Sequence, residues 1–62
     1  MNIPPRQREV LGLLGQGKYG KEIADAMGIT DDTVLVHIRC LKKRLGCRNR
    51  LELALRAHGI EV

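Results

Sequence analysis

The chain has 62 residues, and its 11 lysines and arginines outweigh 7 acidic residues to give a formal net charge of +4. A chain this short makes one domain, residues 1–62, and has little room for an enclosed catalytic pocket beside its core. It lacks tryptophan and phenylalanine, so the core must be aliphatic, and the aromatic platforms that bind single-stranded nucleic acid are missing. The net positive charge favours binding to an anionic partner.

No apolar run approaches the ~20 residues that a membrane span needs, and no signal peptide is recognisable. We therefore expect a cytoplasmic protein with no membrane partner. Cys40 and Cys47 are predicted to lie about 10 Å apart on or near one helix, beyond the reach of a disulfide. They are expected to be free and mostly buried thiols. No zinc-ligand spacing is present, so no metal or cofactor is expected.

The first two of four predicted helices cover residues 5–14 and 21–27. Pro5 can start the first, because the amide that proline lacks would have no partner there anyway. Gly15 follows as a stop signal. After the second helix, Gly28 stands where a left-handed residue is favoured, since glycine has no Cβ to clash.

The third predicted helix covers residues 31–45. The Thr30 hydroxyl can accept an amide proton from its first turn, where Asp31 and Asp32 also favour the helix dipole. Together with the second helix, this segment predicts a helix-turn-helix over residues 23–34, in which Ala24 permits a close crossing. The second helix of this motif commonly enters the major groove of DNA.

The two faces of residues 31–45 differ in character. At ~100° per residue, an apolar stripe is predicted to face the core, and the opposite face carries cations that could follow a phosphate backbone. The stripe consists of Val34, Ile38, Leu41 and Leu45, and the opposite face of Asp32, Leu35, Val36, Arg39, Lys42 and Lys43. A solvated basic face is the simpler interpretation, but its position in a helix-turn-helix favours DNA binding.

The fourth predicted helix covers residues 50–58, with Asn49 and Glu52 as a capping pair and Gly59 as its end. Its apolar residues divide between two faces. Leu51 and Leu55 are assigned to the core, which leaves Leu53 and Ala57 exposed as a weak apolar patch. The whole predicted core is Val10, Leu14, Ile23, Ala24, Met27, Val34, Ile38, Leu41, Leu45, Leu51 and Leu55.

Five short blocks of the chain together resemble the DNA-binding domain of LuxR-type (GerE-like) regulators. They are residues 5–11 (PRQREVL), 21–24 (KEIA), Thr33-Val34 with His37, Leu45-Gly46 and Asn49-Arg50. The resemblance implies an all-α, compact four-helix domain, winged-helix-like but without a wing. It also implies sequence-specific binding to double-stranded DNA, with residues 31–45 in the major groove, as a transcription regulator that pairs on an inverted repeat. The dimer contact is then expected on the fourth helix, at Leu53 and Ala57.

Site residues follow from the resemblance position by position. Base-edge contacts are expected from Leu35, Val36 and Arg39. Phosphate contacts are expected from Lys21, Thr33, His37 and Lys43, with Tyr19 and Gly20 as further candidates, and Lys42 joins them from its place on the basic face. Leu35 stands where the family often has lysine or arginine, and Asp32 where it rarely has an acid. An apolar residue there can contact thymine methyl groups, and the acid can accept from cytosine.

A second class of function is a protein-binding module built on the helix-turn-helix. Such a module would bind a polymerase subunit, a sigma factor or a repressor, with Leu35 and Val36 as its apolar contact. A fragment like sigma-factor region four is a related possibility. RNA polymerase is a possible partner in either case. An enzyme is not expected, because the sequence shows no nucleophile–base pair and no phosphate-cradling loop after a strand.

Overall fold

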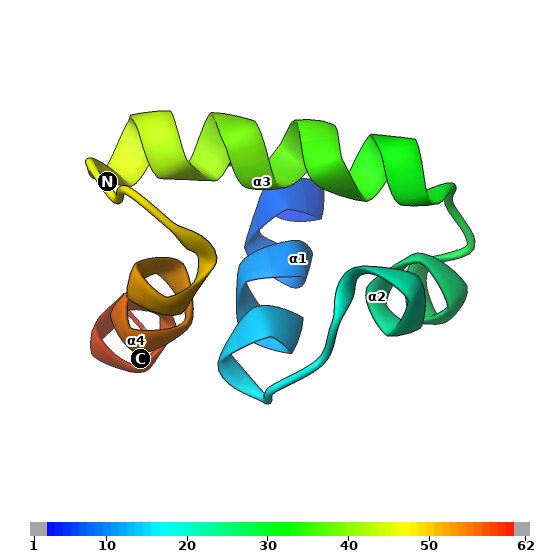
Figure 1. Ribbon diagram of the computed structural model, residues 1–62, viewed down its shortest axis with the longest axis horizontal. Helices are drawn as coiled ribbons and strands as arrows, with labels where there is room; N and C mark the ends of the chain where they lie inside the picture. Colours follow the sequence, from blue (N-terminus) through cyan, green and yellow to red (C-terminus); the bar gives the residue numbers. More distant parts are fainter. Residues whose placement is uncertain (1–2, 61–62) are drawn as a thin grey trace.

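Four helices make up the part of the chain that the computed structural model describes, residues 3–60. They are α1 (Pro5–Gly15), α2 (Gly20–Met27), α3 (Asp31–Leu45) and α4 (Arg50–Ile60). No strand occurs in these residues, which confirms the expected all-α, four-helix class. Figure 1 shows α3 running across one side of the molecule, with α1 crossing beneath it and α2 and α4 on either side of α1.

The turn between α2 and α3 has the geometry of a helix-turn-helix. Gly28 ends α2 with φ 68° and ψ 34°, in the left-handed region, and the Ile29 amide donates to the Ala24 carbonyl at 3.0 Å. Thr30 then caps α3, its hydroxyl oxygen accepting from the Thr33 amide at 3.2 Å. A glycine and a hydroxyl at these two places end one helix and start the next without strain. The motif expected over residues 23–34 is confirmed.

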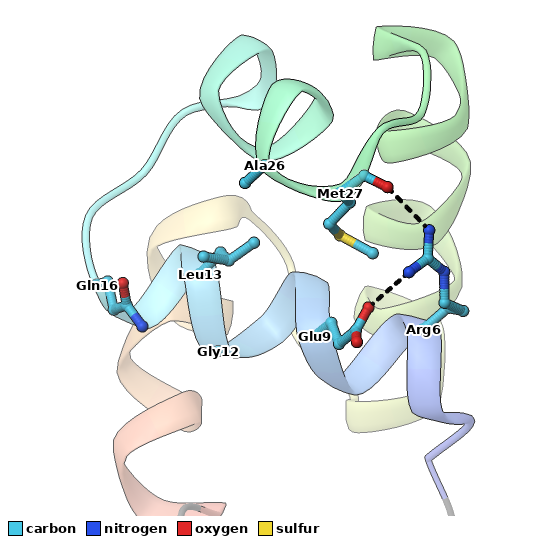
Figure 2. A pocket seen from close by; sticks show the side chains of 7 residues that line it. All are labelled: Arg6, Glu9, Gly12, Leu13, Gln16, Ala26 and Met27. Carbon is cyan, nitrogen blue, oxygen red and sulfur yellow. Dashed lines mark hydrogen bonds and ion pairs between the residues drawn. The ribbon is translucent and has the colours of Figure 1, made fainter.

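A single arginine connects α1 to this turn. Arg6 donates from Nη2 to the Met27 carbonyl at 3.1 Å, at the last residue of α2, and from Nη1 to Glu9 Oε1 at 2.9 Å. Figure 2 shows both bonds at the edge of an open hollow of about 420 Å³ between α1 and α2. The guanidinium satisfies a carbonyl that the end of a helix leaves unpaired. It thereby fixes the position of the turn relative to α1.

The core is one aliphatic cluster to which all four helices contribute. Eight of the predicted core residues are buried in it, and Met27 packs against it half-buried. The eight are Val10, Leu14, Ile23, Ala24, Val34, Ile38, Leu41 and Leu45. Sequence analysis missed four members, which are Ile3, Leu11, Leu53 and Ala57.

The orientation predicted for α4 was wrong. Leu53 is 0% exposed and Ala57 is 8% exposed, so the two residues expected to form a dimer contact lie inside the core. Leu51 and Leu55, expected to be buried, are 67% and 64% exposed. The helix is therefore rotated about its axis by about half a turn from the predicted orientation.

Close packing between α1 and α4 explains which face of α4 turns inward. A Cβ added at Gly15, the last residue of α1, would lie 2.9 Å from the Cβ of Ala57. The two helices approach so closely there that only a small side chain fits against the glycine. Ala57 meets this requirement, and Leu53, one turn earlier on the same face, fills the space beside it.

Smaller differences concern helix ends and the cysteines. α1 extends by one residue to Gly15, and α2 begins one residue early at Gly20. α4 continues to Ile60 because Gly59 does not adopt a positive φ, unlike the glycines that end α2 and α3. Both cysteines are free as expected, but Cys40 is exposed and not buried. Within the described residues, no helix is both long and apolar enough to cross a membrane.

Candidate nucleic-acid interface

The outer face of α3 carries two apolar and two cationic side chains. Leu35 is 48% exposed and Val36 is 50% exposed, and Arg39 and Lys43 are also exposed. The opposite stripe of α3 is buried, so the core holds the helix by one side only. We call Leu35, Val36, Arg39 and Lys43 the outer face of α3. An α-helix fits the major groove of B-form DNA, and Figure 1 shows the other three helices all on one side of α3, so that its opposite side is left uncovered.

Charge is distributed unevenly along α3. Its first turn contains Asp31 and Asp32, and its last turn contains Lys42, Lys43 and Arg44. Between residues 31 and 38 there is no lysine or arginine. This order complements the helix dipole, whose amino end favours anions and whose carboxyl end favours cations. Attraction to a polyanion is thus concentrated in the second half of the helix.

The remaining predicted phosphate contacts differ in accessibility. Lys21 is exposed in the first turn of α2, and Lys42 is half-buried. Thr33 is half-buried, and its hydroxyl is hydrogen-bonded to that of Thr30 at 3.0 Å. His37 is half-buried, and its Nδ1 is fully covered without a hydrogen-bond partner among the described residues. A contact from His37 to phosphate would therefore have to use Nε2.

Two helix-capping interactions position the elements that flank α3. The Glu22 carboxylate accepts from the Tyr19 amide at 2.8 Å, which fixes the start of α2 and with it Lys21. At α4, Asn49 Oδ1 accepts from the Glu52 amide at 2.9 Å, as expected. The Glu52 carboxylate reaches the Arg48 amide at 2.7 Å and not the Asn49 amide. The capping residues of α4 were thus predicted correctly, apart from one partner.

A second apolar surface lies on α4, and sequence analysis had placed it inside the core. Leu51 and Leu55 are exposed one turn apart on the same face. Leu51 also borders an open hollow of about 290 Å³ to which Tyr19, itself 68% exposed, contributes from the other side. Exposed leucines at this spacing resemble the surface of a helix that pairs with another protein chain.

The sequence is similar to known proteins over nearly the whole chain. Residues 1–57 match the family described as bacterial regulatory proteins, luxR family. The chain is 43% identical over 60 residues to the transcriptional regulatory protein MctR of Rhizobium johnstonii. It is 38% identical over 56 residues to the nitrate/nitrite response regulator protein NarL of Escherichia coli K12. It is 45% identical over 54 residues to the transcriptional regulatory protein UhpA of the same strain.

These similarities are confined to part of each relative. They cover 94%, 90% and 87% of this chain, but only 28%, 26% and 28% of MctR, NarL and UhpA. The chain thus spans about a quarter of the length of these relatives. No solved structure matches it significantly.

Proposed function

The chain belongs to the luxR family of bacterial regulatory proteins, a family of DNA-binding transcription regulators, and on that premise we propose that it binds double-stranded DNA in a sequence-specific manner. α3 enters the major groove, and Leu35, Val36 and Arg39 meet base edges. The observation that carries the proposal is the outer face of α3, exposed on the second helix of a helix-turn-helix. Transcription regulation would be the consequence, in the cytoplasm, where bacterial DNA lies.

The proposal assigns the backbone contacts to side chains around that face. Lys43 is exposed one turn beyond Arg39, Lys42 is half-buried on the same helix, and Lys21 is exposed in the first turn of α2. Each phosphate that a lysine or arginine neutralises releases a bound counterion, so the affinity must fall as salt concentration rises. Thr33 and His37 supply short polar contacts that position α3 without reading sequence.

Chemical-shift titration of the 15N-labelled protein with duplex DNA, at low and at moderate salt, tests this function. We expect the amide signals of Val36, Arg39 and Lys43 to move at low salt and to move less as salt rises. The amide of Arg8, on α1, serves as a control for non-specific effects of an added polyanion. If no duplex moves the signals of α3 at low salt, DNA binding is wrong and a protein-binding role for the same face replaces it.

We further propose that two copies pair on DNA through α4, using Leu51 and Leu55. These leucines replace the pair first expected at that contact, because they are the exposed apolar side chains of the helix. Two leucines bury little area, so the free protein should be monomeric at low concentration and pair only when both copies are held on DNA. Two-fold pairing of this kind calls for an inverted repeat with half-sites about one helical turn apart.

Replacing Leu55 with serine should convert the two-to-one protein–DNA complex on an inverted repeat into a one-to-one complex at moderate protein concentration. Sedimentation velocity of the complex gives the stoichiometry. A duplex with a single half-site is the control, because the variant should bind it with unchanged affinity. Retention of two-to-one binding with the wild-type concentration dependence, in both Leu55→Ser and Leu51→Ser, would exclude α4 as the contact.

A further inference from the structure

The first half of α3 is built for a different kind of contact from the second half. On its outer side it offers the carboxylate of Asp32 and the side chains of Leu35 and Val36, all exposed. Asp32 and Leu35 are three residues apart and therefore neighbours on the helix surface. The positive end of the helix dipole could attract a phosphate here, but Asp31 and Asp32 occupy that position with negative charge. This end of α3 should thus attract the DNA backbone less strongly than the basic second half does.

An end of the helix that attracts phosphates only weakly can still contact base edges. In the major groove, the edges present hydrogen-bond donors and acceptors and one apolar group, the 5-methyl of thymine. Leu35 has no polar atom on its side chain and cannot pair with the donors or acceptors. Placing it against a polar base edge would remove water from that edge without replacing the lost hydrogen bond. Contact with a thymine methyl group carries no such penalty.

We propose that Leu35 is a specificity-determining residue that selects a thymine in each half-site by contact with its 5-methyl group. The inference rests on the proposed DNA-binding function and adds the class of base that this side chain recognises. Arg39, one turn further along the same face, then makes the hydrogen-bonded contact with guanine. Leu35 is 48% exposed in the protein, so the surface that the methyl group would cover is available without rearrangement of the core.

The test removes the 5-methyl group of a single thymine and changes nothing else in the DNA. A preferred duplex is first selected from a random library by the wild-type protein, and each thymine of one half-site is then changed singly to deoxyuridine. At one position at least, the wild-type affinity should fall by about fourfold, which corresponds to the burial of one methyl group. The variant Leu35→Ala should bind the thymine and uracil duplexes equally at that position. Fluorescence anisotropy at fixed salt measures both affinities.

Two controls make the outcome specific to Leu35. Gln16→Ala shortens an exposed side chain directly after α1, away from both proposed contacts, and should keep the wild-type preference for thymine. Val36→Ala tests whether the neighbouring apolar side chain, and not Leu35, contacts the methyl group. Should the preference for thymine persist in Leu35→Ala and vanish in Val36→Ala, the assignment to Leu35 is wrong.

The inference and the proposed function can fail separately. If the wild-type protein selects a duplex and binds it in a salt-dependent manner but tolerates uracil at every position, the thymine inference is overturned and DNA binding stands. If the library yields no enriched sequence and no duplex is bound at low salt, the proposed function itself fails.

Discussion

Replacing Leu53 with alanine should lower the free energy of unfolding by about 2–5 kcal/mol, the usual range for a fully buried leucine. Leu53 is 0% exposed and is among the largest fully buried side chains. The close approach of Gly15 to Ala57 restricts how far α1 and α4 can collapse into the space that the substitution leaves. A small domain has a total stability of about 0.05–0.15 kcal/mol per residue. For 62 residues this amounts to about 3–9 kcal/mol, so the substitution should remove a large share of the total stability.

Leu55 provides the matched control, because the same change from leucine to alanine occurs two residues further along the same helix. Its side chain is 64% exposed, and surface substitutions of this kind usually change stability by less than about 0.5 kcal/mol. Urea denaturation followed by the helical circular-dichroism signal compares the two variants. A larger loss of stability in Leu55→Ala than in Leu53→Ala would mean that α4 packs in the orientation first expected from the sequence.

The contrast between α3 and α4 shows what a sequence of this kind can predict. In α3 the apolar residues recur at helical spacing on one side only, and charged residues occupy the other, so its buried stripe was predicted correctly. In α4, leucines stand at positions 51, 53 and 55, and the two sides are about equally apolar. Periodicity cannot choose between such faces. The choice depends on the close fit of Ala57 to Gly15, which is a contact between distant parts of the chain.

Other features were missed because they have no local signal. Ile3 lies before the first helix, so no helical pattern marks it as part of the core. The hydrogen bond from Arg6 to the Met27 carbonyl joins residues 21 positions apart, and no sequence pattern near either residue predicts it. The turn at Gly28 and the cap at Thr30 could be predicted because their chemistry is local. The same holds for the outer face of α3, since a residue opposite a buried stripe must face outward.

Two cations one turn apart on that face should contribute to DNA binding in different ways. Lys43→Ala should weaken binding to all duplexes by a similar factor and reduce the salt dependence by about one counterion. Arg39→Ala should instead remove a preference at particular base positions. A bidentate contact with guanine provides about 1–3 kcal/mol of discrimination, or roughly 5- to 150-fold in affinity. Both side chains are exposed, so neither change should disturb the core.

The physical difference between the two residues lies in their position and their donor geometry. Arg39 lies beside Leu35 and Val36 in the middle of the outer face, where a helix in the groove is nearest the base edges. Its planar guanidinium matches the two acceptors of guanine, whereas the ammonium of Lys43 acts as a single charge. Lys43 lies one turn nearer the basic end of α3, where that single charge can pair with a phosphate of any sequence.

Anisotropy titrations over a range of salt concentrations, on the selected duplex and on duplexes with single base changes, separate these effects. Arg56→Ala removes one exposed positive charge from α4 and is the control for net charge alone. For a protein-binding module, the salt dependence toward DNA would be shallow, Arg39 would matter little, and Leu35→Lys would abolish binding to the protein partner. If Arg39→Ala and Lys43→Ala both lower affinity uniformly, with base preferences unchanged, α3 holds the backbone and does not read the sequence.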